Sequence, residues 1–322
     1  MARERVSWAR IGLGGLSVGT ALLLIATVGC LAARWHWFAE LFAHFRAQYA
    51  IGGGLLAVLW FLLGRGPPAA VTGLLALYHT ALLAPAFVPH ERPPALEAQP
   101  RFRLISVNLM TENESHAGLV AWLREERPDV VVLLEVGEAW RRDLEPLADV
   151  LPAQWFVVRD DNFGIAALAR DRRTTFERIA CGEGMPSVRV RMPLAETTVT
   201  LLGTHPWPPT GGSGTAGRDE QLRGCAALLA LEPRPRVLAG DLNITPWTPI
   251  FDDLLALADL RDSRDGFGLQ PSWLRSFPPL AIPIDHVLHD DSLVVLDRQI
   301  GPEFGSDHRP VRVDFAFVEP RR

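Results

Sequence analysis

The sequence predicts an α/β domain that is preceded by three transmembrane helices. Three long stretches near the N-terminus contain no Asp, Glu, Lys or Arg: Ile11–Ala33, Ala47–Gly64 and Gly66–Pro89. From residue 101 onward, apolar β-prone segments alternate with segments whose apolar residues recur at helical spacing. Residues 101–322 are long enough for one large domain, and strands mixed with helices over such a length are typical of layered α/β folds.

Each apolar stretch is long enough to cross the roughly 30 Å hydrocarbon core of a bilayer as a helix. A cleaved signal peptide fits the first stretch poorly, because its apolar run is too long and two similar runs follow. The alternative is three buried helices of a soluble domain, although such helices normally have a polar face. His79 interrupts the third stretch, either as a functional site or as a histidine that faces a neighbouring helix.

Positive charge beside the spans predicts that the N-terminus lies in the cytoplasm. The arginines of the N-terminal tail and second loop outnumber those of the first loop: Arg3, Arg5, Arg10 and Arg65 against Arg34 and Arg46. Three spans then place the chain after about residue 90 outside the cytoplasm. The proline-rich segment 91–100 is predicted to be a linker between the anchor, residues 1–90, and the domain, residues 101–322.

The charge of the domain restricts its partners. The whole chain has a net charge of −5 and residues 1–100 carry +3, so residues 101–322 carry −8. Such a domain is a poor non-specific binder of duplex DNA, since that affinity comes from cations placed on phosphates. Acidity instead suits a site that concentrates a divalent metal ion. Cys181 and Cys225 can pair if the domain lies outside the cytoplasm, which their spacing does not decide.

Within the domain, apolar patterning predicts alternating strands and helices. Val130–Leu134 is a continuous apolar run, as expected of a strand buried on both faces. His116–Arg127 has helical spacing and ends before a proline. The Gly- and Pro-rich segment 206–216 is predicted to be a mobile loop. Further strands are predicted at 102–109, 163–169, 188–190, 198–203, 237–239 and 311–317, and a second helix at 218–231.

Polar side chains stand at the ends of these predicted strands. Because strand ends on one edge of a sheet converge, residues far apart in the sequence can meet there in one cleft. Hydrolysis of a phosphate ester needs a hard cation on oxygen ligands to neutralise the phosphate, a carboxylate that handles water, and an imidazole that meets the developing charge. The polar residues at or beside the predicted strand ends are Asn108, Glu135, His205, Asp241, Asn243, Asp285, His286, Asp307 and His308.

Six short motifs that contain these residues occur in order along the domain. They are Ser-Val-Asn at 106–108, Pro-Asp-Val-Val-Val-Leu-Leu-Glu at 128–135, Gly-Thr-His-Pro at 203–206, Gly-Asp-Leu-Asn at 240–243, Ile-Asp-His-Val-Leu at 284–288 and Ser-Asp-His-Arg-Pro at 306–310. In these motifs the domain resembles the endonuclease/exonuclease/phosphatase superfamily, which includes DNase I-like nucleases, inositol-phosphate phosphatases and sphingomyelinases. The resemblance implies a four-layer sandwich of two β-sheets flanked by helices, in a membrane-anchored member of bacterial type.

The resemblance also implies a metal site and catalytic roles. Glu135 is expected to be the main ligand of Mg²⁺, which Mn²⁺ can replace, with Asn108 and Asp307 close to the ion. Leu134 departs from the family pattern, which often has Gln before this glutamate. Asp241 is expected to position or deprotonate the attacking water.

The remaining catalytic roles come from the same resemblance. Asn243 is expected to help orient the water, and His308 to contact the scissile phosphate while Asp285 holds its tautomer. His205 matches a second histidine of the nuclease branch, which can assist the leaving group. Which histidine acts as acid and which as base stays open. His286 is expected to support the fold.

Two further segments lie near the motifs. The segment 270–283, which contains Trp273 and Phe277, forms an apolar wall of the cleft, a surface against the membrane or part of the core. The loop after His205 has no basic residue until Arg218, so a long basic insertion that clasps DNA is not expected.

The sequence therefore predicts a membrane-tethered, Mg²⁺-dependent hydrolase that faces outward. Its expected substrates are phosphodiesters, either in nucleic acid or in the headgroup of a lipid or inositol phosphate. Its expected partners are that substrate and the lipid bilayer, with no obligate protein partner. One alternative is a non-catalytic binding module on the same fold, and another is a membrane assembly protein whose spans do the main work.

Overall fold

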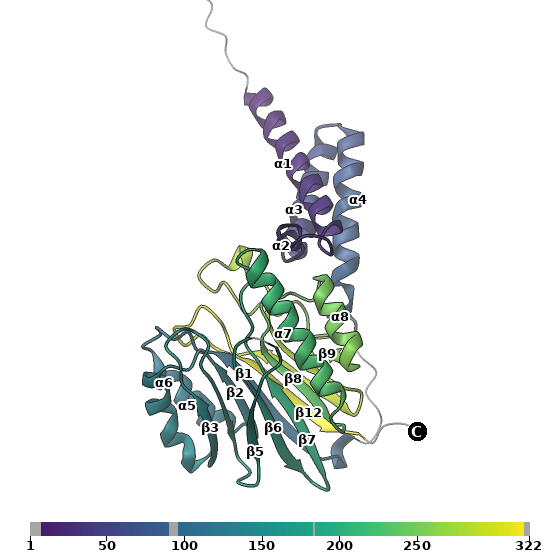
Figure 1. Ribbon diagram of the computed structural model, residues 1–322. Helices are drawn as coiled ribbons and strands as arrows, with labels where there is room; N and C mark the ends of the chain where they lie inside the picture. Colours follow the sequence, from purple (N-terminus) through teal and green to yellow (C-terminus); the bar gives the residue numbers. More distant parts are fainter. Residues whose placement is uncertain (1–7, 90–95, 183, 319–322) are drawn as a thin grey trace, which may run out of the picture. The chain divides into compact units, whose positions relative to one another are not determined.

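The computed structural model describes residues 8–89, 96–182 and 184–318, which belong to two units (Figure 1). The first unit contains the N-terminal helices up to residue 85 together with residues 247–249, and the second contains the rest of the chain. Residues 91–95 of the predicted linker lie outside the described residues, and Leu96–Ala98 forms a short 3-10 helix.

The first unit is built from apolar helices: α1 (Trp8–Leu31), α2 (Trp37–Ala43), α3 (Arg46–Leu62) and α4 (Gly66–Leu83). The segments Gly12–Ala32 and Gly66–Phe87 are each long and apolar enough to cross a membrane. Helix α3 has 17 residues, or about 26 Å of length, and is bent by 62° from α2. Two helices can therefore span a membrane, or three if α2 and α3 form one broken span.

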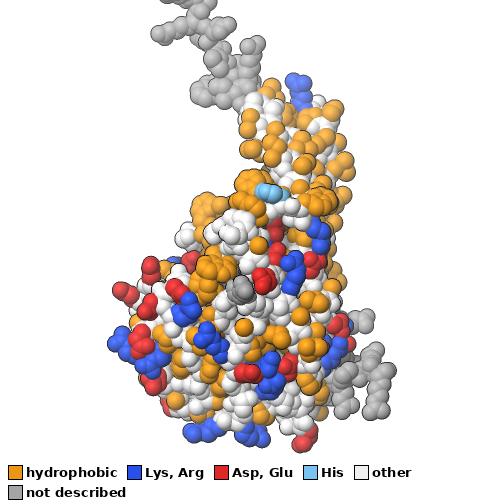
Figure 2. All heavy atoms as spheres, viewed as in Figure 1, with side chains coloured by type: hydrophobic (Ala, Val, Ile, Leu, Met, Phe, Trp, Pro, Cys, Tyr) orange, Lys and Arg blue, Asp and Glu red, His pale blue; other side chains and the backbone are white. Residues whose placement is uncertain are grey.

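Large apolar side chains cover the outward faces of these helices (Figure 2). More than half of the side-chain surface is exposed at Leu22, Val28, Leu55, Phe61 and Leu74. An apolar surface of this extent is unfavourable in water. The observation favours contact with lipid over the alternative of buried helices in a soluble domain.

His79 links three of the four helices. Its Nε2 lies 3.1 Å from Thr27 Oγ1 on α1, and its Nδ1 lies 3.5 Å from Arg46 Nη1 on α3. The ring of Tyr49 packs against it at 5.2 Å between centroids. His79 therefore faces its neighbouring helices, one of the two roles that the sequence allowed.

Two mixed six-stranded sheets form the second unit. The first has the order β11 (Leu293–Ile300), β12 (Val311–Phe317), β1 (Arg101–Asn108), β2 (Val130–Leu134), β4 (Ile165–Ala169) and β3 (Ala153–Val157). The second has the order β5 (Thr175–Ile179), β6 (Ser187–Leu194), β7 (Thr197–Gly203), β8 (Arg236–Asp241), β10 (Asp285–His289) and β9 (Arg261–Asp262). The pairs β1–β2 and β7–β8 are parallel and the other pairs are antiparallel.

The hydrophobic core lies between the sheets and under the flanking helices. Phe102, Val132, Val190, Val237 and Phe315 belong to the cluster that the sheets share. A second cluster packs one sheet against α5 (His116–Glu126) and α6 (Glu138–Leu144), and a third packs the other against α7 (Gly212–Ala230) and α8 (Pro249–Ala258) (Figure 1). Short 3-10 helices occur at Ala84–Phe87, Glu145–Asp149 and Pro278–Leu280.

The predicted mobile loop at 206–216 is wrong in its second half, because α7 begins at Gly212. Gly211 adopts a φ of 98°, a conformation that glycine reaches without steric cost, and this turns the chain into the helix. Thr215 Oγ1 then donates to the carbonyl of Gly211 at 3.0 Å. Because the first residues of α7 are rich in glycine, the sequence pattern predicted a loop there and a helix that begins too late.

A disulfide joins Cys181, which follows β5, to Cys225 in α7. Gly224 next to it allows the close approach, since a Cβ there would lie 1.5 Å from the carbonyl oxygen of Cys181. The pairing that the sequence left open is thus present in the structure.

We expect Gly240→Ala to destabilise the second unit by about 2–4 kcal/mol. Gly240 has a φ of 147°, and an added Cβ would lie 2.0 Å from the carbonyl oxygen of Thr204. Denaturant unfolding of the full chain measures the effect. Gly182→Ala is the matched control, because its Cβ would meet neighbours only at 3.4 Å. Equal stability of the two variants would contradict the prediction.

Candidate active site

Strand ends of both sheets bring the predicted site residues together. Asn108 is the last residue of β1, and Glu135 directly follows β2, which runs parallel to β1. Asp241 ends β8 and Asp285 begins β10, and the antiparallel register pairs these two residues directly. Directly opposed residues project from the same face of a sheet, so their side chains are neighbours.

His308 approaches these two carboxylates from the other sheet, on the segment before β12. Its Nδ1 lies 2.8 Å from Asp285 Oδ2 and its Nε2 lies 3.6 Å from Asp241 Oδ2. The backbone N–H of His308 donates to Ser306 Oγ at 3.0 Å, and the Ser306 hydroxyl donates to the carbonyl of Asn108 at 2.9 Å. All three titratable side chains are buried. The site therefore forms only where the two sheets meet.

Asp241 is surrounded by hydrogen-bond donors. Its Oδ2 accepts from Asn108 Nδ2 at 3.2 Å and lies 3.4 Å from His205 Nε2. Its Oδ1 accepts from the backbone N–H of Asn243 at 3.0 Å. Asn243 has a left-handed φ of 53°, and its side-chain amide donates to the carbonyl of Pro206 at 3.1 Å. The turn after β8 is thereby held against the loop that carries His205.

The buried charges shift one another's pKa values. Burial alone would raise the pKa of Asp241, but the fields of His308 and His205 outweigh it and lower that pKa to about 2. Burial alone would lower the pKa of His308, but Asp285 and Asp241 outweigh it and raise that pKa to about 10. Burial also opposes charge on His205, yet its hydrogen bond to Asp241 raises the pKa. At neutral pH Asp241 is therefore a carboxylate and His308 an imidazolium.

Glu135 is held by fixed donors while its side chain stays partly accessible to solvent. Its Oε1 accepts from Asn108 Nδ2 at 2.9 Å, and its Oε2 accepts from the backbone N–H of Thr111 at 3.2 Å. Glu135 has a φ of 60°, and its carbonyl accepts from Thr111 Oγ1 at 3.2 Å, which supports this left-handed backbone. Each carboxylate oxygen keeps a lone pair for a further partner.

Asn108 connects the two carboxylates through its amide nitrogen, which donates to both Glu135 and Asp241. Its Oδ1 is used by the backbone N–H of Met110 at 3.0 Å. Asn108 thus positions the two acids, and its predicted role beside a metal ion stays a prediction.

Sequence reasoning missed several residues that position the site. The indole N–H of Trp273 donates to Asp307 Oδ2 at 2.9 Å, whereas the sequence allowed this segment to form an apolar wall of the cleft, a surface against the membrane or part of the core, without a polar contact. Ser272 Oγ accepts from the backbone N–H of Asp285 at 3.2 Å. Both residues lie in a proline-rich segment whose sequence does not predict these bonds, because the bonds depend on tertiary contacts. His286 packs on Phe251 and lies 2.9 Å from the carbonyl of Ile244, as predicted for a residue that supports the fold.

A group of three buried side chains offers a possible site for a divalent metal ion. Ligand atoms of Asp241, Asp285 and His308 all lie within 4.8 Å of one another. Two carboxylates and one imidazole are a donor set that suits several divalent cations, so the group does not identify the metal. This set differs from the predicted one of Glu135, Asn108 and Asp307.

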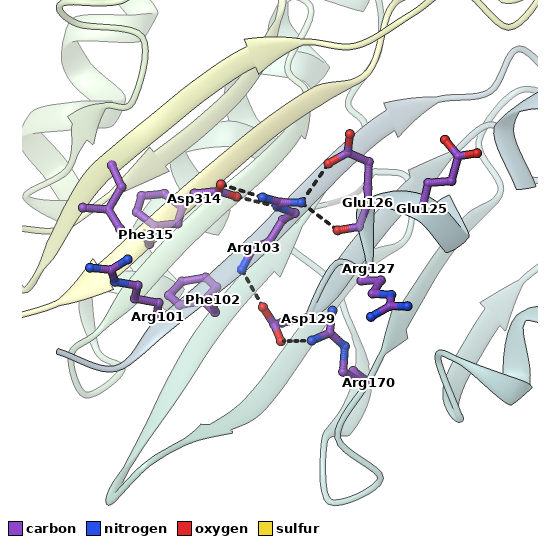
Figure 3. A pocket seen from close by; sticks show the side chains of 11 residues that line it. Arg101, Phe102, Arg103, Glu125, Glu126, Arg127, Asp129, Arg170, Asp314 and Phe315 are labelled. Atoms are coloured by element: carbon purple, nitrogen blue, oxygen red, sulfur yellow. Dashed lines mark hydrogen bonds and ion pairs between the residues drawn. The ribbon is translucent and has the colours of Figure 1, made fainter. Parts of the chain in front are cut away.

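A separate cavity of about 560 Å³ lies at the other end of β1 (Figure 3). It is lined mainly by residues from the start of β1, the end of α5 and the middle of β12, and several of its charges pair with one another. Arg103 donates to Asp314 at 2.7 Å and to Glu126 at 2.8 Å, and Arg170 lies 3.1 Å from Asp129. The cavity shares no lining residue with the network around His308.

The fold and the site agree with the sequence profile of one family, described as "Endonuclease/Exonuclease/phosphatase family", which matches residues 105–308. The chain belongs to this family. It is accordingly a metal-dependent hydrolase of phosphate esters. Among curated proteins, none matches the sequence.

Solved structures of similar fold share little sequence with this member of the endonuclease/exonuclease/phosphatase family. D. rerio TDP2 complexed with a single-strand DNA product has 19% identity and a TM-score of 0.57, over 67% of this chain and 98% of that one. An endonuclease/exonuclease/phosphatase from Beutenbergia cavernae has 21% identity and a TM-score of 0.55, over 68% and 72%. A functionally unknown protein from Enterococcus faecalis has 14% identity and a TM-score of 0.56, over 67% and 99%. At these identities the likeness shows a shared fold and nothing further.

Proposed function

We propose that this protein is a membrane-tethered phosphodiesterase that uses Mg²⁺ or Mn²⁺, with its catalytic domain outside the cytoplasm. The observation that carries the proposal is the buried network in which His308 meets Asp285 and Asp241. An imidazolium fixed between carboxylates is a preorganised donor for an anionic phosphate oxygen. The predicted catalytic residues Asp241, Asn243, His205, Asp285 and His308 all belong to this network.

Glu135 is the proposed main ligand of the metal, with Asn108 and Asp307 near the ion. In the alternative group of three, Nδ1 of His308 already shares a hydrogen bond with Asp285, which leaves Nε2 for a cation, and that nitrogen carries a proton while His308 is an imidazolium. Glu135 instead offers partly accessible oxygens that keep free lone pairs. Carboxylate oxygens suit hard cations such as Mg²⁺ and Mn²⁺. When bound, such a cation neutralises phosphate charge and polarises the phosphorus–oxygen bond.

The residues of the chain supply the remaining chemistry. Asp241 accepts a hydrogen bond from the attacking water, and since its pKa is about 2 it orients the water more than it removes a proton. Asn243 helps to orient the same water. His308 donates from Nε2 to a phosphate oxygen, and Asp285 keeps the proton on Nδ1. His205 donates a proton to the leaving oxygen.

Two substrate classes fit this chemistry. Nucleic acid is favoured by His205, which matches the nuclease branch, and one structural relative was solved with a DNA product. A lipid headgroup is favoured by the apolar helices and by the net charge of −8 on residues 101–322. The dependence of the rate on salt separates them, because affinity for nucleic acid falls steeply as salt rises.

The outward orientation has support from the disulfide. Bonds such as Cys181–Cys225 form and persist in oxidising compartments and are rare in the cytoplasm. The arginine pattern beside the predicted spans points in the same direction.

We expect removal of metal to abolish hydrolysis by the full chain in detergent. The substrates are single-stranded DNA, duplex DNA, RNA, sphingomyelin and inositol phosphates, each tested with Mg²⁺, with Mn²⁺ and after EDTA. Activity should return when Mg²⁺ is restored, and Glu135→Ala should require at least about tenfold more metal for half-maximal activity. Activity that ignores both EDTA and Glu135→Ala would overturn the metal assignment. No hydrolysis of any substrate would favour the non-catalytic binding module.

A further inference from the structure

Two aromatic side chains form an apolar face beside the site, and the mechanism does not use them. Phe163, in the turn before β4, lies 5.5 Å from His205 and 4.8 Å from Trp207 between ring centroids. Trp207 follows β7 and is 38% exposed, whereas His205 is 5% exposed. The aromatic pair Phe163–Trp207 therefore packs beside a buried catalytic histidine, with Trp207 partly exposed to solvent.

The loop that carries Trp207 holds this side chain in place. Prolines at 206, 208 and 209 restrict its backbone, and the N–H of Thr210 donates to the carbonyl of Pro208 at 2.8 Å. The amide of Asn243 bonds the carbonyl of Pro206. A Cβ added at Gly217 of α7 would lie 3.3 Å from Trp207, so the indole rests closely on that helix. A fixed, partly exposed tryptophan is a preformed contact surface that costs little entropy on binding.

Charge around the aromatic pair decides which ligand fits it. Asp160 and Asp161 are exposed next to Phe163, and the nearby Arg159 is paired with Asp161. The strand of a nucleic acid would bring further phosphates to this surface, where like charge repels them. An uncharged apolar group meets no such penalty and gains from contact with two aromatic rings.

We propose that Phe163 and Trp207 bind the apolar alcohol that leaves phosphorus, so that the substrates are lipid phosphodiesters. This inference rests on the proposed function. In the reaction, the oxygen of water forms a bond to phosphorus and the bond from phosphorus to the lipid oxygen breaks. The lipid oxygen takes a proton from His205, the proton of the water that Asp241 orients passes to solvent, and His205 regains a proton from solvent. The products are a free lipid alcohol and a phosphate monoester of the headgroup.

The test compares two lipids that differ only in acyl length, dibutanoyl- and dioctanoyl-phosphatidylcholine, below their micellar concentrations. The full chain is held in amphipol with Mg²⁺, so that free detergent does not compete, and release of phosphocholine is measured. We expect the wild type to prefer the longer lipid about 10–100-fold in kcat/KM. The double variant Phe163→Ala/Trp207→Ala should lose at least about tenfold of this preference, which is the ratio of kcat/KM for the two lipids within one variant, so that a loss common to both lipids cancels.

Leu231→Ala is the matched control, because Leu231 is 83% exposed at the end of α7 and should leave the preference unchanged. The short lipid reports whether the double variant is folded and chemically competent. The dinucleotide thymidylyl-thymidine is the third substrate. An unchanged preference in a variant that cleaves the short lipid overturns the proposal, as does hydrolysis of the dinucleotide without hydrolysis of either lipid. If the wild type cleaves none of the three but hydrolyses another substrate of the panel under Proposed function, this inference fails and the proposed function stands; if it hydrolyses none of them, the proposed function itself fails.

Discussion

Replacing His308 with alanine should lower kcat/KM for phosphodiester hydrolysis by about 10²–10⁴-fold. The imidazolium is the donor that meets the phosphate, and its two ring nitrogens face Asp285 at 2.8 Å and Asp241 at 3.6 Å. Removal also leaves two buried carboxylates without the cation between them, which weakens folding. Thermal unfolding of the metal-free variant must therefore accompany the kinetics.

Asp285→Asn changes the protonation of His308 while its imidazole ring stays in the site. Asp285 and Asp241 together outweigh burial and raise the pKa of His308 to about 10, so loss of the Asp285 charge should lower that pKa. The expected result is an alkaline limb of the rate profile that moves to lower pH. The double variant His308→Ala/Asp285→Asn should be little worse than His308→Ala alone, because Asp285 acts through the ring. Additive losses would show that Asp285 has an independent role.

The same pKa predicts how stability depends on pH in the metal-free protein. A folded pKa of about 10 exceeds the usual 6.5 of histidine, so the contribution of His308 is complete below pH 6.5 and is lost as pH rises through 10. For Asp241 the folded pKa of about 2 lies below the usual 3.8, so its contribution is present above pH 3.8 and is lost as pH falls through 2.

The second large effect is expected for Asp241→Asn, which should lower kcat by about 10²–10⁴-fold with little change in overall shape. The amide keeps the size of the side chain but removes the charge to which His205, His308 and Asn108 are directed. Its nitrogen would also face these donors, which reverses the hydrogen bonding of the network. Asp259→Asn is a control, since the side chain of this acid is 77% exposed and pairs with Arg234 at the surface.

Asp241→Asn also separates the functional hypotheses. A phosphodiesterase loses turnover while circular dichroism still shows a folded chain, and thermal unfolding shifts to lower temperature because the buried network loses a charge. The membrane assembly alternative instead predicts that Asp241→Asn is silent and that deleting residues 1–90 abolishes function. Wild-type turnover by the variant would therefore remove Asp241 from the proposed mechanism.

Much of the fold was predictable because its central strands have strong signals. Val130–Leu134 and Val311–Phe317 were predicted with their observed bounds, since unbroken or alternating apolar runs depend on burial alone. The edge strands β3 and β5 were missed because their residues are largely half-buried or exposed and leave a weak pattern. The start of α7 was missed because glycine-rich composition is typical of loops.

The candidate site likewise has a part that the sequence predicts and a part that it does not. Residues in the ordered motifs could be named from the sequence, and the structure gathers Glu135, Asp241 and His308 into one hydrogen-bonded neighbourhood. The bond from Trp273 to Asp307 could not be foreseen, because it joins segments that only tertiary folding brings together. The three spans were predicted from composition, but the break between α2 and α3 depends on local geometry that hydropathy does not record.

The register between β8 and β10 makes assembly of the site an all-or-none event. Asp285 lies opposite Asp241, and His286 lies opposite Gly240. Because side chains alternate between faces, a slip of β10 by one residue would turn Asp285 away and present His286 in its place. His308 would then lose its partner, and His286 would join His205 and His308 as a third imidazole at the site. A chain that pairs β10 with β8 in the wrong register is therefore inactive. Measured activity thus indicates that the two strands are paired in the correct register.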